Sequence, residues 1–266
     1  MTRLFAKERI AKLRQKQESS FTPIFLHRPL AILFLIPTAD IAWVTPNRIT
    51  FVSTIMRFIT AALLWPEAMG GIHETPATLW TAILLWHLGS VFDAMDGALA
   101  RYRGTSSAFG RFIDKVPDRM IALALVLSIS ARAYVETNEV LYVLLGMVYV
   151  SMSGITSTAK WIDLGIRADL TGATKAVDPI ERPAPERTPM QWVLYALWSL
   201  RTIIVVTEMD LPLWGTLAVL FQKETLLLSY LAIFIVPYTF GITFKRARGI
   251  WKLEQARNAR TTPNAS

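Results

Sequence analysis

Residues Asp93 to Asp118 read DAMDGALARYRGTSSAFGRFIDKVPD. This segment lies where one apolar stretch, residues 77–100, ends and the next, residues 109–133, begins. It carries four aspartates: Asp93, Asp96, Asp114 and Asp118. A carboxylate at the centre of a bilayer costs roughly 2.5–3.5 kcal/mol on insertion scales, so charged residues retained beside hydrocarbon usually have a function. The pattern predicts a functional site at the junction of two membrane helices.

The spacing predicts that the four carboxylates act together. Asp93 and Asp96 are three residues apart and share one face of a helix, and Asp114 and Asp118, four apart, share a face of the next. The turn at residues 103–107 makes the two helices antiparallel neighbours, so that the two faces can meet. Four converging carboxylates repel each other unless cations lie between them.

Oxygen ligands without nearby histidine or cysteine favour a hard ion, namely Mg²⁺, Mn²⁺ or Ca²⁺. Two such ions can clamp a pyrophosphate and neutralise its charge. Gly97 and Gly110 leave room for a ligand to approach the backbone. Arg101 can donate two hydrogen bonds to a phosphate.

The remainder of the chain is typical of a multi-span membrane protein. Hydrophobic residues make up 53% of the 266 residues and charged residues only 18%, and there is no cysteine. Long apolar stretches recur along the chain. They predict an all-α integral membrane fold with six transmembrane helices, at residues 49–66, 77–100, 109–133, 140–164, 190–207 and 226–244.

Proline cuts the apolar segment at residues 21–44, which we interpret as an amphipathic helix lying in the membrane interface. Residues 211–221 are expected to pack at the outer surface. The predicted organisation is a basic N-terminal segment with the interfacial helix (1–44), a transmembrane catalytic domain (45–249) and a basic cytoplasmic tail (250–266).

Charge bias predicts the orientation. Lysine and arginine are abundant at both chain ends, at residues 101–103 and at residues 160–187, whereas residues 67–76, 134–139 and 207–210 contain acidic side chains but no lysine or arginine. By the positive-inside rule, both ends and the aspartates face the cytoplasm, and those three acidic loops face outward. The net charge of +8 thus fits an anionic membrane surface rather than nucleic acid. We expect a multi-pass protein of the plasma membrane.

The pattern D-x2-D-G-x2-A-R-x8-G-x3-D-x3-D resembles the signature of the CDP-alcohol phosphotransferase family. The chain has the required residue at every fixed position. Thr45-Pro46-Asn47, at the head of the first span, is similar to the family's element near the donor nucleotide. The resemblance implies the family's six-helix fold, catalysed transfer of a substituted phosphate from a CDP-alcohol, release of CMP, and two Mg²⁺ or Mn²⁺ ions. It also implies a homodimer.

The resemblance implies a role for each matching residue. Asp93, Asp96 and Asp114 would be metal ligands, and Asp118 would be both a ligand and the general base toward the acceptor hydroxyl. The residues expected to bind the CDP donor are Thr45, Pro46, Asn47, Gly97, Ala100, Arg101, Ser107 and Gly110. Some of these have simpler structural interpretations: Ser107 as a helix cap, Thr45-Pro46-Asn47 as a helix start, and Arg101 as a positive charge on the cytoplasmic side.

CDP-diacylglycerol is the expected donor because a lipid donor explains a site in a membrane, and a polar donor such as CDP-inositol is the alternative. The core segment is most similar to phosphatidylinositol-phosphate synthases, which favours inositol phosphate as the acceptor, with glycerol phosphate as another candidate. By the same resemblance Lys160 and Arg187 would bind the acceptor phosphate. The family's short arginine motif is interrupted here by two residues, in Glu181-Arg182-Pro183 and Glu186-Arg187. Arg201, inside the fifth span, is a further candidate.

Two other classes of function fit parts of the pattern. An ion or proton transporter would use an acidic cluster, but its path would need polar residues continuing toward the other face. A metal-binding scaffold would not need Asp118. Release of CMP distinguishes the enzyme from both.

Overall fold

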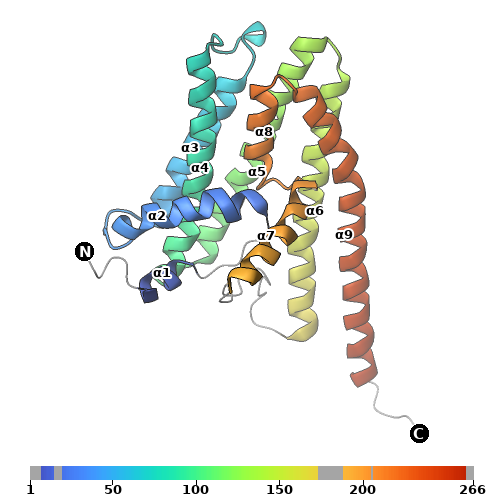
Figure 1. The fold of residues 1–266 in the computed structure, drawn as a ribbon. Helices are drawn as coiled ribbons and strands as arrows, with labels where there is room; N and C mark the ends of the chain where they lie inside the picture. Colours follow the sequence, from blue (N-terminus) through green and yellow to red (C-terminus); the bar gives the residue numbers. More distant parts are fainter. Residues whose placement is uncertain (1–6, 15–19, 173–187, 205, 262–266) are drawn as a thin grey trace.

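The computed structural model describes residues 7–14, 20–172, 188–204 and 206–261, and these residues form helices without a strand. The long helices lie side by side and α2 crosses them at a large angle (Figure 1). The helices are α1 (Lys7–Leu13), the π-helix η1 (Pro23–His27), α2 (Arg28–Thr38), α3 (Pro46–Leu64), the 3-10 helix η2 (Glu67–Met69), α4 (Pro76–Tyr102), α5 (Ala108–Thr137), α6 (Leu141–Thr171), α7 (Pro189–Ile204), α8 (Leu211–Leu220) and α9 (Glu224–Thr261).

Local sequence explains where the helices near the aspartates start and stop. Thr45 caps α3 and Thr75 caps α4. Each threonine is followed by a proline at the first helical position, where an N–H would have no partner within the helix, so its absence costs nothing. Gly104 ends α4 with a φ of +67°, a conformation that glycine adopts without strain. Three residues later Ser107 caps α5. This short turn makes α4 and α5 neighbours, as the spacing predicts.

Three of the described helices are long and apolar enough to cross a membrane: Phe112–Thr137 in α5, Leu141–Thr171 in α6 and Glu224–Asn258 in α9. Large apolar side chains on the outside of the bundle, such as Phe51, Ile233 and Phe244, are each about two-thirds exposed. An exposed apolar surface of this extent is suited to hydrocarbon and not to water.

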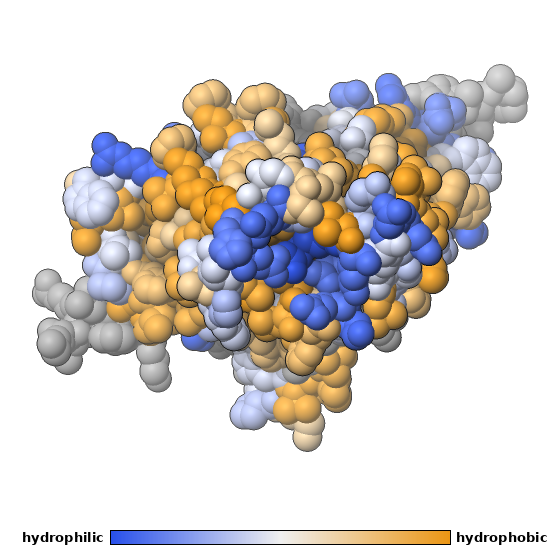
Figure 2. Space-filling view, turned by 90° about the horizontal axis from the view of Figure 1, so that it is seen from above, coloured by the Kyte–Doolittle hydropathy of each residue, from blue (hydrophilic) through white to orange (hydrophobic). Residues whose placement is uncertain are grey.

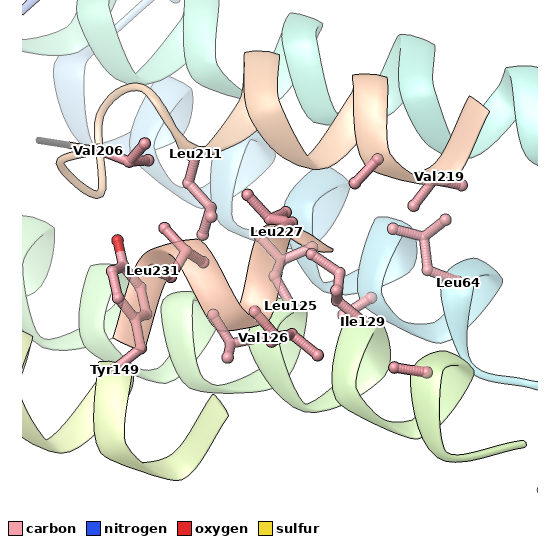
Figure 3. Close-up of a cluster of buried hydrophobic side chains, with 14 of the residues drawn as sticks. Leu64, Leu125, Val126, Ile129, Tyr149, Val206, Leu211, Val219, Leu227 and Leu231 are labelled. Carbon is pink, nitrogen blue, oxygen red and sulfur yellow. The ribbon is translucent and has the colours of Figure 1, made fainter. Parts of the chain in front are cut away.

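Two buried clusters hold the bundle together. The larger cluster joins α3, α4, α5, α6, α8 and α9, and Leu64, Leu125, Tyr149, Val219 and Leu231 are among its members (Figure 3). The smaller cluster packs α1 and α2 against α3 and α4. Within residues 21–44, α2 follows η1 directly, and Pro37 lies inside α2 near its end.

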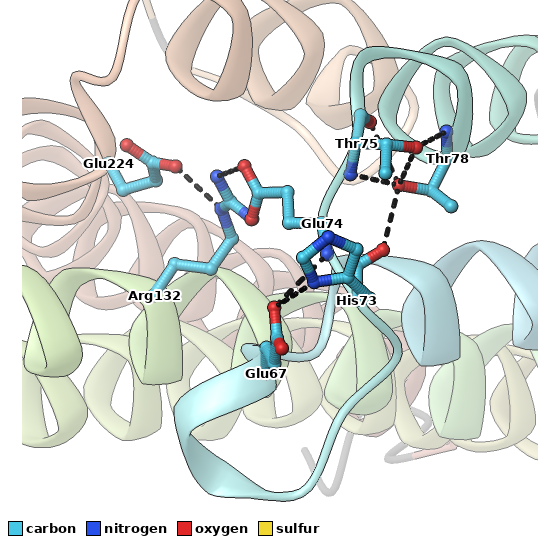
Figure 4. Close-up of polar contacts among 7 residues, drawn as sticks. All are labelled: Glu67, His73, Glu74, Thr75, Thr78, Arg132 and Glu224. Carbon is cyan, nitrogen blue, oxygen red and sulfur yellow. Dashed lines mark hydrogen bonds and ion pairs between the residues drawn. The ribbon is translucent and has the colours of Figure 1, made fainter.

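A polar network ties together the end of the bundle at the top of Figure 1. Arg132 of α5 donates to Glu74, at 2.6 Å, and to Glu224 of α9, at 2.7 Å (Figure 4). The Arg132 guanidinium holds the pKa of Glu74 below its usual value through these hydrogen bonds. Figure 2 views this end, where hydrophilic residues gather in the middle of a largely apolar surround.

The segment after α7 differs from its prediction in two ways. Residues 207–210 are predicted to face outward and the N-terminal end the cytoplasm, yet the two segments are in contact: Asp210 accepts a hydrogen bond from the Thr22 amide, at 2.8 Å, and the hydroxyls of Ser20 and Thr207 are 3.2 Å apart. Residues 211–221 are not an outer surface element either: α8 is buried against Trp86 of α4. At 1.5 Å per residue, α7 spans about 24 Å and α8 about 15 Å. Each is therefore shorter than a hydrocarbon core of about 30 Å.

Candidate active site

The aspartates converge where the C-terminal part of α4 meets the N-terminal part of α5. Asp93, Asp114 and Asp118 each offer a carboxylate oxygen, and these three oxygens lie within 4.8 Å of one another. Their side chains are between 19% and 32% exposed, so the cluster is sheltered yet accessible. The predicted meeting of the two aspartate-bearing faces is confirmed.

Asp96 lies beside this group and is held separately. It is 6% exposed, and one of its carboxylate oxygens accepts a hydrogen bond from the Thr50 hydroxyl of α3, at 2.5 Å. The hydrogen bond gives a donor to a buried oxygen, whose burial without one would cost free energy, and it fixes the rotation of the carboxylate. Asp96 is therefore pre-oriented by α3.

Two cations neutralise part of the acidic charge. The Arg57 guanidinium of α3 bridges Asp93, at 2.9 Å, and Asp118, at 3.1 Å. The Lys115 ammonium bridges Asp114, at 2.6 Å, and Asp118, at 3.0 Å. Both oxygens of Asp118 thus accept from a cation. Among the described contacts, one oxygen of Asp93, one of Asp114 and both of Asp96 have no cation.

The donor set fits a hard divalent cation. The available ligands are carboxylate oxygens, and opposite ligands of an octahedral Mg²⁺ are about 4.2 Å apart, since each Mg–O bond is about 2.1 Å. Oxygens within 4.8 Å of one another reach that spacing with small side-chain adjustments. The paired aspartates of α4 and α5 would hold such an ion between the two helices.

Several of the predicted donor-binding residues have structural roles. Thr45 accepts from the Arg48 amide, at 3.4 Å, and Ser107 from the Gly110 amide, at 2.9 Å, so both cap helices. A side chain at Gly97 would meet the Arg101 guanidinium at 3.2 Å, which places Arg101 over that glycine. Pro46 and Asn47 open α3, and Ala100 accepts from Thr105 in the turn after α4. Their contacts with a donor stay predictions.

The predicted acceptor-binding residues are described only in part. Lys160 lies on α6 with its ammonium 5.5 Å from the centre of the Trp161 ring. Arg187 lies outside the described residues. Arg201 lies on α7, and its side chain is outside the described part of the chain.

Sequence reasoning missed three residues that contact the aspartates: Thr50, Arg57 and Lys115. Arg57 carried a usable signal, because an arginine in the middle of an apolar span is costly unless it is paired. Lys115 lies within the aspartate pattern itself. Thr50 carried no signal, since a hydroxyl in a membrane helix often bonds its own backbone.

Comparison with known proteins identifies a family and several relatives. Residues 43–220 match the sequence model of a family described as CDP-alcohol phosphatidyltransferase. A phosphatidylinositol phosphate synthase of Mycobacteroides abscessus is 28% identical over 180 residues, which cover 61% of this chain and 73% of the relative. A protein of the same description from Corynebacterium glutamicum is 30% identical, over 66% of this chain and 72% of the relative. An archaetidylinositol phosphate synthase of Pyrococcus horikoshii is 28% identical, over 41% and 53%.

Proposed function

Since the chain belongs to the CDP-alcohol phosphatidyltransferase family, we propose that it transfers a phosphatidyl group from CDP-diacylglycerol to the hydroxyl of inositol phosphate, with release of CMP. The chain is a CDP-alcohol phosphotransferase and a membrane protein. The observation that carries the proposal is the convergence of Asp93, Asp114 and Asp118 on one group of oxygens. The choice of acceptor rests on the relatives described as phosphatidylinositol phosphate synthases.

Asp93, Asp96, Asp114 and Asp118 would hold two divalent ions, Mg²⁺ or Mn²⁺. When bound, such ions neutralise the charge that builds on the pyrophosphate as CMP leaves. The donor residues named above would position the nucleotide at the start of α3 and the end of α4. Lys160, Arg187 and Arg201 would hold the acceptor phosphate.

Asp118 would act as general base. The acceptor oxygen attacks the phosphorus that carries diacylglycerol, the bond from that phosphorus to the CMP oxygen breaks, and the hydroxyl proton passes to Asp118. Each Asp118 oxygen accepts from one cation and keeps a further lone pair that can take the hydroxyl proton. Lys115 is the partner that would move aside to admit the acceptor, since its side chain is 45% exposed and that of Arg57 only 11%.

Six membrane crossings fit the helix order, with α7 and α8 sharing one crossing. In this arrangement the aspartates face the cytoplasm and the end in Figure 2 faces outward. A homodimer in the plasma membrane is part of the proposal by family resemblance.

The test is CMP release by the purified protein with CDP-diacylglycerol and Mg²⁺, against inositol phosphate, glycerol phosphate, serine, inositol and choline. We expect release with inositol phosphate. Asp118→Asn should retain donor binding, because the amide keeps the shape of the side chain, but lose roughly 10²–10⁴-fold in turnover.

Retained turnover in Asp118→Asn would contradict its role as base. Release with a different acceptor would correct the acceptor alone. If no acceptor supports release from protein that binds CDP-diacylglycerol, the proposed transfer is wrong, and CDP-inositol is the next donor to assay.

A further inference from the structure

Arg57 is an arginine held inside the aspartate cluster. Its side chain is 11% exposed, and its two terminal nitrogens contact Asp93 of α4 and Asp118 of α5. Its third nitrogen, Nε, is buried and has no hydrogen-bond partner in the described part of the chain. The polar contacts of the guanidinium are therefore directed at the two carboxylates.

The helices are shaped to hold this arginine. A side chain at Gly89 of α4 would lie 2.7 Å from Cγ of Arg57, a distance too short for any contact between carbon atoms. Gly89 thus leaves the space through which the stem of Arg57 passes between α3 and α4. Ser53, one turn before Arg57, donates to the Gly89 carbonyl at 2.9 Å and holds the two helices at this separation.

The charges inside the cluster do not balance without a divalent ion. As metal ligands, the four aspartates must be deprotonated and would carry four negative charges, of which Arg57 and Lys115 offset two. Two negative charges remain, which one Mg²⁺ neutralises. A second ion would leave two positive charges, and a pyrophosphate joined to two alcohols carries two negative charges that would offset these.

We propose that Arg57 is a permanent internal counter-cation that makes metal binding sequential: the cluster takes one divalent ion by itself and a second only together with the pyrophosphate of the donor. The inference rests on the proposed metal site. It makes Arg57 a positioning residue, because it acts on the aspartates and not on the reacting atoms. Its expected consequence is that the donor raises the affinity for the second ion, and by thermodynamic linkage the second ion raises the affinity for the donor equally.

The experiment counts Mn²⁺ bound to the purified full chain by electron paramagnetic resonance of the free ion. Without donor, we expect one tightly bound Mn²⁺ per chain; with saturating CDP-diacylglycerol and no acceptor, we expect two. In Arg57→Met, the second Mn²⁺ should bind about tenfold more tightly or better without donor, because a positive charge a few ångströms away has been removed. Arg57→Lys keeps the positive charge and should bind one Mn²⁺ tightly without donor, like the wild type.

Arg132→Met is the matched control. Arg132 is also 11% exposed and also bridges two carboxylates, but these are Glu74 and Glu224 at the other end of the bundle. Its loss should leave the Mn²⁺ count unchanged. Added Mn²⁺ should raise the melting temperature of Arg57→Met more than that of Arg132→Met, since only the first has lost a cation from the metal site.

Two tight ions in the wild type without donor would overturn the inference, as would an unchanged affinity for the second ion in Arg57→Met. These outcomes are separable from the enzyme proposal. If the wild type releases CMP but binds two ions without donor, the transferase stands and the role of Arg57 falls. If the wild type binds the two ions sequentially but releases no CMP, the role of Arg57 stands and the transferase proposal falls.

Discussion

At the scale of single residues, the aspartates depend on partners that α3 supplies. Arg57 offsets charge between Asp93 and Asp118, and Thr50 orients Asp96. Partners of this kind commonly change metal affinity by 10–100-fold although they do not touch the ion. The first span is thus part of the proposed active site and not only a neighbour of it.

Thr50→Val tests this dependence. The substitution keeps the shape of the side chain but leaves an oxygen of buried Asp96 without its donor, so we expect Mg²⁺ affinity to fall about tenfold. Calorimetric titration with Mg²⁺ measures the change. Thr60→Val is the matched control, because Thr60 is buried on the same helix and donates to the backbone carbonyls of Met56 and Ala82. Equal losses in both variants would contradict a specific role for Thr50.

At the scale of elements, α8 is a short buried helix whose position depends on close packing. A side chain at Gly215 would lie 2.2 Å from the ring of Trp86, which is 1% exposed and has no room to move. Glycine here lets α8 approach α4 more closely than any other residue would. The packing explains why one side of α8, with Leu211, Gly215 and Val219, is buried although the uniform apolarity of residues 211–221 also suited an outer surface.

Gly215→Ala is therefore expected to destabilise the protein by about 1–3 kcal/mol, the usual cost of overpacking. The melting temperature in detergent, followed by tryptophan fluorescence, is the measurement. Gly241→Ala, on α9 with nothing within 4 Å of the added methyl group, should leave the melting temperature unchanged or raise it slightly, since alanine favours a helix. A Gly215→Ala protein as stable as the wild type would show that α8 can shift away from Trp86.

At the scale of the whole molecule, the two ends of the bundle differ in chemistry. One end carries the aspartate cluster, and the other carries the Glu74–Arg132–Glu224 network. Between them the outer surface is largely apolar. A site at one end of such a bundle can take a donor whose acyl chains stay in the bilayer.

The proposed orientation can be tested by labelling, because the chain has no cysteine and an introduced one is unique. Ala68, exposed in η2, and Ala256, exposed near the end of α9, are suitable positions. With both chain ends in the cytoplasm, a membrane-impermeant thiol reagent should label Ala68→Cys in intact cells and Ala256→Cys only after permeabilisation. The opposite pattern would place the active site outside.

Local sequence signals predicted the helices around the aspartates and a convergence of all four carboxylates, of which Asp93, Asp114 and Asp118 do converge. Periodicity, prolines, glycines and caps act locally, so the predicted span at 77–100 agrees closely with α4 (Pro76–Tyr102). The folded arrangement was needed to show that Thr50 holds Asp96 apart, which cations enter the cluster, and where residues 207–210 and α8 lie. Those outcomes depend on contacts between residues far apart in the chain, such as Arg57 with Asp118 and Thr22 with Asp210, which local patterns do not encode.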